Sequence, residues 1–392
     1  MINSFIRSFI KESFTLFPKL RFKEFDDDWS PYVLKDFVSF RKGKGISKAD
    51  ISENGINECI RYGELYTTYG QVIDHIHSKT NVSKSECILS KAGDVIIPAS
   101  GETQIDIATA SCVLHDDIIL SGDLNILSHE ENGSWLAYYL SSAKKLEIAQ
   151  LAQGNSVVHL YSSQLKDLKI NKPSKEEQTK IASFLSNVDE KISQLTKKHE
   201  LLSQYKQGMM QKLFSQQVRF KADDGSEFGE WDQLKFKDVI KIKYGKDHKK
   251  LDDGDIPVLG TGGVMRYVDS YLYEGESILI GRKGTIDKPR FISGKFWTVD
   301  TLFYTEIGEK ILPKFAFQQL LLVNWLNLNE ATGVPSLNTT SIGNIELKVP
   351  CLAEQTKIAN VLSAIDQKIE VVSKQIEQAK QWKKGLLQQM FI

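Results

Sequence analysis

The chain is poor in cysteine, and this scarcity excludes two kinds of site. It has 392 residues but only four cysteines, Cys59, Cys87, Cys112 and Cys351, and no two of them stand at the spacing of a pair. Disulfide frameworks and zinc sites both need such pairs. We therefore expect free or buried thiols in a reducing compartment, and a cytoplasmic protein.

Two further absences limit the partners. No apolar run approaches the roughly 20 residues that cross a bilayer, so we expect no membrane span. Basic and acidic residues balance at 50 each. A chain without net charge has no overall field that attracts an anion, so nucleic-acid binding would require local basic clusters or other subunits.

Motifs of nucleotide and methyl-transfer enzymes are also missing. The sequence has neither an Asn/Asp-Pro-Pro-aromatic motif nor a Gly-x-x-x-x-Gly-Lys-Ser/Thr loop. The glycine-rich string at 260–263 lacks the acidic residue of a cofactor loop, which favours a turn between strands. His75 and His77 alternate like two ligands on one strand, but without a nearby third ligand a surface strand is the better interpretation. We expect no catalytic residue, metal or cofactor in this chain.

What the sequence does contain is one long stretch in two copies. Glu177 to Phe214 returns as Glu354 to Phe391 at a constant offset of 177, and 18 of the 38 positions are identical. So long a match without a gap indicates an internal duplication.

Both copies are predicted to be helical. Their apolar residues alternate at spacings of four and three, the a/d pattern of a coiled coil. Pro173-Ser174 followed by two glutamates is typical of a helix start. About forty residues at about 1.5 Å each would form a rod of about 60 Å. The predicted seam residues are Ile181, Leu185, Val188, Ile192 and Leu195 in the first copy, and Ile358, Leu362, Ile365, Ile369 and Val372 in the second.

Polar residues interrupt this seam. Lys206 and Lys383 are equivalent across the duplication, and His199 stands where the second copy has Ile376. A polar seam residue usually fixes the register of a coiled coil at some cost in stability. We favour that role over ligand binding.

The remaining chain predicts an α+β protein with two globular domains. Arg21-Phe22-Lys23 and Arg219-Phe220-Lys221 each open a segment of short strands bounded by Gly, Pro, Asp and Ser. Helices are predicted at corresponding places, Trp135–Leu151 and Lys314–Leu328. The expected order is an amphipathic segment at 1–19 packed on the helical region, domains at 20–172 and 218–350 with irregular sheets, and helices at 173–217 and 351–392.

Several motifs together point to a family. Glu-Gln-x-x-Ile-Ala opens both helices, after Ile170-Asn171-Lys172-Pro173 and Leu347-Lys348-Val349-Pro350 respectively. Further strings are Pro18-Lys19-Leu20-Arg21-Phe22, the glycine-rich strings at 260–263 and 280–285, and the string at 333–338. In this combination the chain resembles, over essentially its whole length, the specificity (S) subunit of type I restriction-modification systems.

The resemblance implies a fold, a function and partners. It implies two target-recognition domains that each read half of a bipartite, asymmetric site in double-stranded DNA. Two long antiparallel helices, related by a pseudo-twofold axis, would separate them and set the spacer. The implied partners are two methyltransferase subunits, which would hold S-adenosylmethionine, and two restriction/translocase subunits. The chain itself would not be an enzyme, and would serve DNA methylation and bacterial defence.

DNA contacts need polar side chains on loops that reach a groove and lysines near the phosphates. In the second domain the loop at 282–285 follows a strand, and the aligned place in the first domain is 100–104. The two loops share a Gly-x-Thr character but differ in charge, as expected if they read different bases. The predicted DNA-binding residues are Arg41, Lys42, Lys44, Ser100, Glu102, Thr103, Gln104, Lys246, Lys249, Thr261, Arg266, Arg282, Lys283, Thr285, Ser336 and Asn338.

A second hypothesis remains open from the residues alone. The balanced charge also suits a duplicated coiled-coil scaffold that binds only protein partners. Salt-sensitive binding to DNA distinguishes the two hypotheses.

Overall fold

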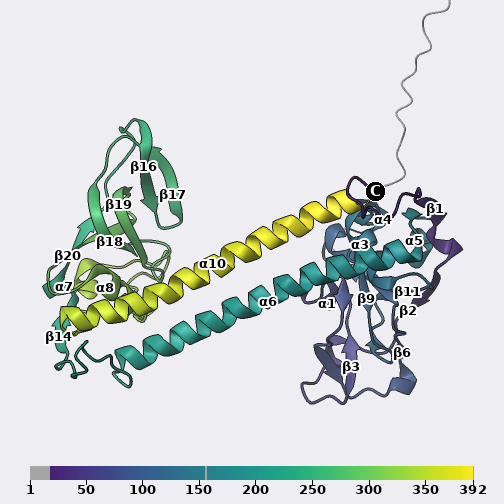
Figure 1. Cartoon of the computed structure of the whole chain (residues 1–392), viewed down its shortest axis with the longest axis horizontal. Helices are drawn as coiled ribbons and strands as arrows, with labels where there is room; N and C mark the ends of the chain where they lie inside the picture. Colours follow the sequence, from purple (N-terminus) through teal and green to yellow (C-terminus); the bar gives the residue numbers. More distant parts are fainter. Residues whose placement is uncertain (1–17, 155–156, 392) are drawn as a thin grey trace, which may run out of the picture. The chain divides into compact units, whose positions relative to one another are not determined.

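The computed structural model describes residues 18–154 and 157–391, and the amphipathic helix predicted at the N-terminus lies outside this range up to residue 17. The chain divides into two compact units. Unit 1 contains the described residues up to Leu195 and again from Gln375, and unit 2 contains Thr196–Lys374. Two long helices, α6 (Lys175–Phe214) and α10 (Leu352–Met390), each contribute to both units (Figure 1).

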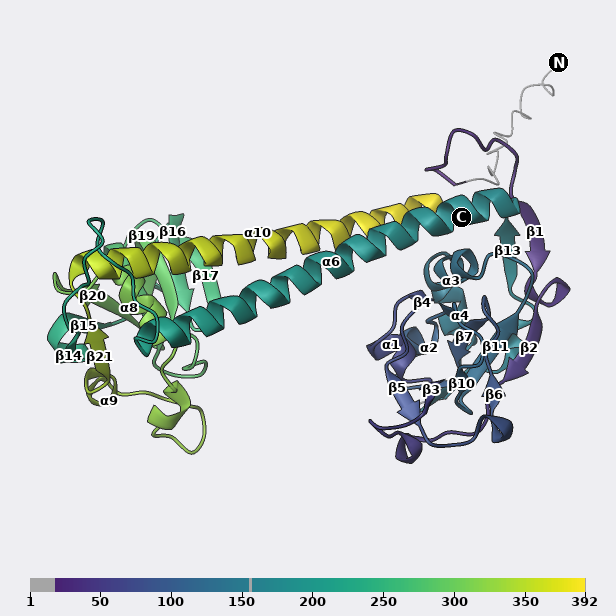
Figure 2. The ribbon, with the colours of Figure 1, turned by 60° about the horizontal axis from the view of Figure 1, so that its bottom comes forward.

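Unit 1 is built on a five-stranded sheet in the order β2-β11-β7-β9-β4 and a four-stranded sheet in the order β5-β3-β10-β6. Helices α3 and α4 lie between the five-stranded sheet and α6 (Figure 2). The strands are β1 (Ser30–Val33), β2 (Ser39–Lys42), β3 (Asn57–Ile60), β4 (Val72–Ile73), β5 (Ser78–Thr80), β6 (Ile88–Leu89), β7 (Val95–Pro98), β8 (Ser100–Gly101), β9 (Ser111–Val113), β10 (Ile119–Leu120), β11 (Leu124–Ser128), β12 (Val158–His159) and β13 (Lys169–Lys172). The short helices are α1 (Glu64–Thr67), α2 (Gln104–Ile107), α3 (Gly133–Ser142), α4 (Lys145–Leu151) and α5 (Ser162–Leu165).

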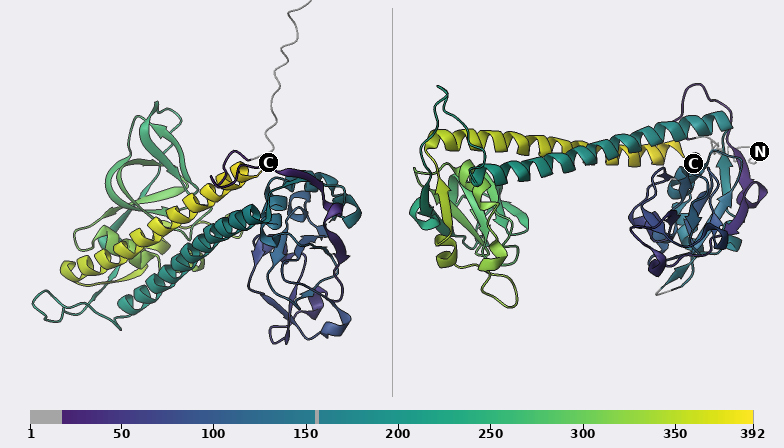
Figure 3. Two further views of the ribbon diagram at one scale, coloured as in Figure 1. Left: turned by 45° about the vertical axis from the view of Figure 1, so that its right-hand side comes forward. Right: turned by 90° about the horizontal axis from the view of Figure 1, so that it is seen from below.

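Unit 2 is built on a six-stranded sheet in the order β15-β20-β18-β19-β16-β17. The hairpin of β16 and β17 projects beyond the other strands (Figures 1 and 3). The strands are β14 (Asp232–Lys235), β15 (Ile240–Tyr244), β16 (Asp253–Gly260), β17 (Gly263–Val268), β18 (Tyr273–Gly281), β19 (Arg290–Thr298), β20 (Leu302–Ile307) and β21 (Glu346–Val349). The helices are α7 (Phe236–Val239), α8 (Pro313–Leu320) and α9 (Thr339–Gly343).

The two units share a strand order. In unit 1 each strand in the series β2-β11-β7-β9 pairs antiparallel with the next, and β4 pairs parallel with β9 at the end of the series. In unit 2, β15, β20, β18 and β19 pair antiparallel in the same way, and β16 adds in parallel to β19. A two-stranded ladder also joins the two ends of each globular segment, β1 with β13 and β14 with β21. Unit 2 adds β17, and unit 1 adds the four-stranded sheet.

Most predicted seam residues are buried, but part of the seam has a different role from the one expected. Ile181, Leu185 and Val188 belong to the core of unit 1 and pack with Trp135 and the buried Leu386 of α10. Their burial in this core means that the first turns of α6 anchor a domain and also meet the last turns of α10.

Unit 2 repeats this arrangement with the other helix. Ile358, Leu362 and Ile365 of α10 join a core that contains Phe315 and the buried Leu213 of α6. The later seam residues differ in exposure: Leu195 and Val372 are buried, whereas Ile192 and Ile369 are half-buried.

The doubled Glu-Gln dipeptide fastens each helix to its domain. Arg21 donates two hydrogen bonds to the Glu177 carboxylate, both of 2.7 Å. Arg219 donates to Glu354 at 3.0 and 2.7 Å. Both glutamates are almost fully buried, at 1% and 0% exposure. A buried, bidentate pair of this kind fixes orientation as well as position.

Two cross-helix ion pairs follow the same duplication. In unit 1, Lys383 of α10 lies 2.6 Å from Asp189 of α6, and in unit 2, Lys206 of α6 lies 2.6 Å from Asp366 of α10. The lysines are two of the polar seam residues, and the aspartates are 177 positions apart like the lysines. These contacts support a register-fixing role for the lysines.

The two predicted shorter helices are interrupted. The first is divided between α3 and α4, with Ala143 and Lys144 outside both. The second ends as α8 at Leu320 and is followed by a 3₁₀ turn at Trp325–Leu328. The indole of Trp325 donates to the Leu320 carbonyl at 3.0 Å, which folds this turn back onto the end of α8.

Among the described residues, no helix is long and apolar enough to cross a membrane. Over residues 18–154 and 157–391, no cluster of three or more His, Cys, Asp or Glu could hold a metal ion.

Candidate nucleic-acid interface

The loops after β7 and β18 occupy the same place in the two units. His159 pairs with Ser100 in unit 1, and Ser336 forms a bridge with Lys283 in unit 2. In both units the next residue is a leucine, whose backbone amide donates to the carbonyl of the residue before Ser100 or Lys283. Leu160 donates to Ala99 at 3.0 Å, and Leu337 donates to Arg282 at 2.9 Å. Ser100 therefore corresponds to Lys283, and His159 corresponds to Ser336. This agrees with the loop alignment made from the sequence.

A glycine fixes the neighbouring segment in both units. A Cβ on Gly43 would lie 1.9 Å from the Ser121 carbonyl oxygen, and one on Gly245 would lie 2.0 Å from the Val299 carbonyl oxygen. No side chain fits at either place. The lysines that follow these glycines, Lys44 and Lys246, are exposed. The backbone amide of Lys44 donates to the Leu120 carbonyl at 3.0 Å, and that of Lys246 donates to the Thr298 carbonyl at 2.8 Å.

In unit 1 these segments enclose a hollow of about 520 Å³, whose lining includes Lys42, Ser100, Asn125, His159 and Tyr161. The Ser100 hydroxyl lies 3.2 Å from Nδ1 of His159. The ring of Tyr161 stacks on the imidazole, with centroids 6.3 Å apart and planes at 20°. Asn125 is buried and donates to the Leu160 carbonyl at 2.9 Å. The hollow thus presents hydrogen-bonding groups on a fixed frame.

The predicted residues of unit 1 differ in their availability. Lys42 lines the hollow and is exposed, Glu102 is exposed on the loop after β8, and Gln104 is exposed at the start of α2. Thr103 caps α2, because its hydroxyl accepts from the Asp106 amide at 3.1 Å and donates to the Asp106 carboxylate at 2.6 Å. Its side chain therefore supports the loop.

Arg41 has partners within unit 1. Its guanidinium lies 2.5 Å from the carboxylate of Asp94, which is 3% exposed, and it also donates to the Leu89 carbonyl at 3.2 Å. A buried carboxylate that lost this partner would be left uncompensated. The Arg41 side chain is still 32% exposed, and its contact with DNA stays a prediction.

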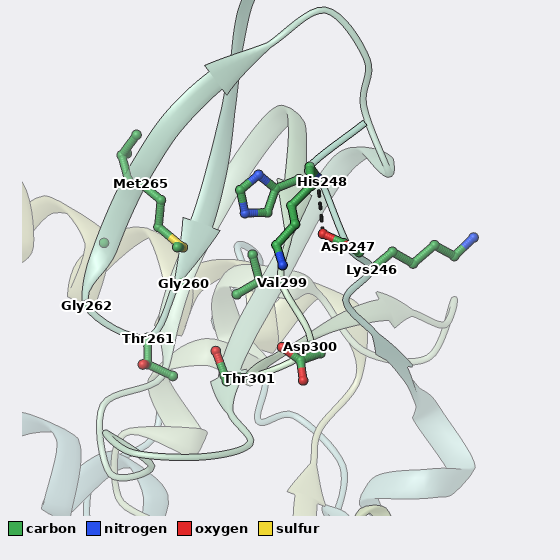
Figure 4. A pocket seen from close by; sticks show the side chains of 13 residues that line it. Lys246, Asp247, His248, Gly260, Thr261, Gly262, Met265, Val299, Asp300 and Thr301 are labelled. Carbon is green, nitrogen blue, oxygen red and sulfur yellow. Dashed lines mark hydrogen bonds between the residues drawn. The ribbon is translucent and has the colours of Figure 1, made fainter. Parts of the chain in front are cut away.

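In unit 2 a larger hollow of about 760 Å³ lies beside the corresponding loop (Figure 4). One wall comes from residues 246–249, the opposite wall from the glycine-rich turn at 260–263, and the base from residues 299–301. His248 and Met265 point into the hollow, whereas Lys246 points away from it. Lys249 and the half-buried Thr261 are among the lining residues.

The loop at 282–285 presents cations next to this hollow. The Arg282 guanidinium lies 5.4 Å from the ring centroid of Tyr244 and donates to the Asp300 carbonyl at 3.1 Å. These contacts hold Arg282 in place before any ligand binds. Lys283 and Thr285 are exposed on either side of Gly284, whose φ of +88° favours glycine.

Three of the more weakly predicted DNA-binding residues in unit 2 make contacts within the unit. Arg266 pairs with Asp253 at 2.6 Å. Asn338 caps α9 by accepting from the Ser341 amide at 2.7 Å, and its amide group donates to Glu330. Ser336 lies in the bridge to Lys283, which fixes its backbone. The side chains of Arg266 and Asn338 therefore have partners within unit 2, and their contact with DNA stays a prediction.

Sequence reasoning missed several residues at these hollows. They are Asn125, His159 and Tyr161 in unit 1, and His248 and Met265 in unit 2. A signal for two of them was present. His159-Leu160-Tyr161 has the same place before a helix as Ser336-Leu337-Asn338, but only the buried leucine is shared.

The chain matches a known family model, described as the type I restriction modification DNA specificity domain, at residues 26–203 and 229–381. Among curated proteins it is similar to the type I restriction enzyme MjaVIII specificity subunit of Methanocaldococcus jannaschii, with 26% identity over 92% of this chain and 91% of that one. The putative MjaX specificity subunit of the same organism is also 26% identical, over 95% and 94% of the two chains.

Solved structures show the same fold. The type I restriction-modification S subunit from M. genitalium superposes with a TM-score of 0.71 at 19% identity, covering 96% of this chain and 99% of that one. A chain from a structure described by the assembly and conformational transition of the type I R-M system gives a TM-score of 0.51 at 14% identity, covering 92% and 96%.

Proposed function

The chain belongs to the type I restriction modification DNA specificity family and is a specificity subunit of such a system, and we propose that each of its units reads one half of a bipartite, asymmetric DNA site. One observation carries this proposal. The two units hold corresponding loops on the same backbone frame, yet place different side chains on it, His159 against Ser336 and Ser100 against Lys283. Two readers of this kind would accept two different base sequences.

The polar groups at each hollow suit the two kinds of DNA contact. Exposed lysines, such as Lys42 and Lys249, can neutralise phosphates, while Arg282 and Lys283 can donate to the acceptors of guanine. The chain has no net charge, so its affinity depends on these local groups and on its partners.

The long helices have a separate role in this proposal. As an antiparallel coiled coil they would set the spacer between the half-sites, since equivalent DNA half-sites recur about every 34 Å along one face. Their outer faces would dock two methyltransferase subunits, in pairs because the chain is duplicated. Methyl transfer and S-adenosylmethionine would belong to those partners, with restriction subunits joining outside them, and this chain would not catalyse the reaction.

A salt titration tests the proposal. The full chain, assembled with its methyltransferase partners, is titrated with random duplex DNA in a gel-shift assay at several salt concentrations. We expect a linear fall of log K with log salt. Replacing Lys42 and Lys249 by glutamine should make the slope shallower by about two if each contacts one phosphate.

The matched control replaces Lys235 and Lys241 by glutamine. Both are exposed, lie on β14 and β15 away from the hollow-lining residues, and change the net charge equally. The control should keep the wild-type slope. Absence of any salt-sensitive binding would refute the DNA-reading role and favour a scaffold that binds only proteins.

A further inference from the structure

The geometry points to His159 as the residue that reads a base edge in the half-site bound by unit 1, with Ser100 orienting its ring. This inference rests on the proposed function and adds to it the chemistry of one position. His159 would donate a hydrogen bond to a purine acceptor, such as N7 or O6 of guanine.

The backbone of His159 is held on both sides. It pairs with Ser100 across the β8–β12 ladder, and with Gln153 through two hydrogen bonds, in which its amide donates at 2.7 Å and its carbonyl accepts at 2.9 Å. A backbone fixed in this way carries its side chain to one place at the hollow. Only the imidazole remains to meet a ligand.

The ring is oriented as well as placed. Ser100 is 7% exposed, and its hydroxyl lies within hydrogen-bond distance of Nδ1. The ring of Tyr161 lies nearly parallel to the imidazole, with the ring centroids 6.3 Å apart. Over the described parts of the chain, Nε2 has no hydrogen-bond partner, although His159 is only half-buried.

The contact of Ser100 with Nδ1 bears on the chemistry of Nε2, the other ring nitrogen of His159. When the Ser100 hydroxyl donates to Nδ1, the ring proton must be on Nε2, which then acts as a donor. The major groove presents the acceptors N7 and O6 on guanine and N7 on adenine. Lys42, exposed at the same hollow, is a suitable partner for the adjacent phosphate.

Unit 2 offers different chemistry at the same two places. Ser336 occupies the position of His159, and Lys283 occupies the position of Ser100. The longer side-chain donor is therefore on the other member of the pair in unit 2. The frame is unchanged, because both units keep the bridge and the following leucine amide bond. The two units should therefore differ in the base they select here.

Methylome sequencing tests the inference. The full chain is co-expressed with its methyltransferase partners in a host without other DNA methylation, and the modified motif is read for the wild type and for His159→Ser. We expect one position of one half-site to lose its purine preference by about three- to tenfold, the range of one hydrogen bond. The other half-site should stay unchanged.

Three further variants make the outcome decisive. Ser100→Ala should weaken the preference at the same position, because the ring loses its orientation, whereas the exposed His75→Ser should leave the motif intact. If His159→Ser gives no methylation, His159→Gln, which keeps a side-chain donor, should restore the purine-containing motif. Loss of methylation in that variant too would overturn the inference.

Two results separate this inference from the proposed function. A bipartite wild-type motif that His159→Ser leaves unchanged would overturn only the role of His159. A wild-type chain that directs no bipartite methylation would overturn the proposed function.

Discussion

Two adjacent residues explain why one dipeptide recurs at the start of both long helices. Glu177 forms an ion pair with Arg21, at the start of the first globular segment. Glu354 forms the equivalent pair with Arg219, at the start of the second globular segment. Gln178 and Gln355 each donate to the carbonyl of a proline five residues earlier, at 3.1 and 2.8 Å. Gln178 also accepts from the Asn132 amide at 3.0 Å, just before α3. The pair thus ties the helix start to both ends of its domain.

A glycine next to the proposed DNA-binding hollow gives a stability prediction. Gly245→Ala should destabilise unit 2 by about 1–3 kcal/mol, because a Cβ there would lie 2.0 Å from the Val299 carbonyl oxygen and force the strands apart. Gly262→Ala is the matched control, since a Cβ there meets nothing within 4 Å. Urea unfolding of the full chain measures both. Equal midpoints for the two variants would contradict the prediction.

A histidine in unit 1 whose two ring nitrogens are buried gives a pH prediction. Burial lowers the pKa of His129 below its ordinary value of 6.5. The unfolded chain takes up the proton at the ordinary pKa while the folded chain resists it, so stability should fall as the pH drops below about 6.5. His129→Phe should reduce this pH dependence, and the exposed His75→Phe should not. Urea midpoints at pH 7.5 and 5.5 decide, and an unchanged dependence in His129→Phe would contradict the assignment.

At the scale of elements, the duplication pairs each helix with the other copy. Lys206 of α6 forms an ion pair with Asp366 of α10, and Lys383 of α10 forms the equivalent ion pair with Asp189 of α6. Lys383 also donates to Gln71 at 2.9 Å, and Tyr138 donates to Asp189 at 2.6 Å. In each unit the ion pair therefore joins the two helices next to a globular core.

A double-mutant cycle on one of these pairs tests the register-fixing role. Lys206→Met and Asp366→Asn should each destabilise unit 2, with a coupling energy of about 1 kcal/mol because the lysine is largely buried while the aspartate is 39% exposed. Exchanging the two charges should recover most of the loss. The exposed Lys374–Glu370 pair within α10 serves as control and should show a smaller coupling. Zero coupling at Lys206 would rule out the register role.

The sequence predicted the elements better than the side-chain contacts. Periodicity placed both long helices, and the Ser174 cap is confirmed by its bond from the Glu177 amide at 3.2 Å. The ion pair of Arg41 was not predicted because its partner, Asp94, is distant in sequence and a charged residue carries no mark of an internal ion pair. His159 was missed because its significance comes from strand pairing with Ser100.

At the scale of the whole molecule, the account predicts modularity. The β14–β21 ladder closes the second globular segment, 218–350, on itself, and the Arg219–Glu354 pair joins this segment to α10. A segment closed in this way should be exchangeable for the corresponding segment of another family member without disturbing unit 1. Equal assembly with methyltransferase partners would check that the exchanged chain is intact.

The most direct test is the methylome of cells that carry this chain and its partners, compared with cells in which residues 218–350 have been exchanged. The account predicts a bipartite motif for the original chain, and an exchanged chain whose motif differs in one half-site while the other half-site and the spacer stay the same. A motif without two parts, or a change in both halves, would contradict it.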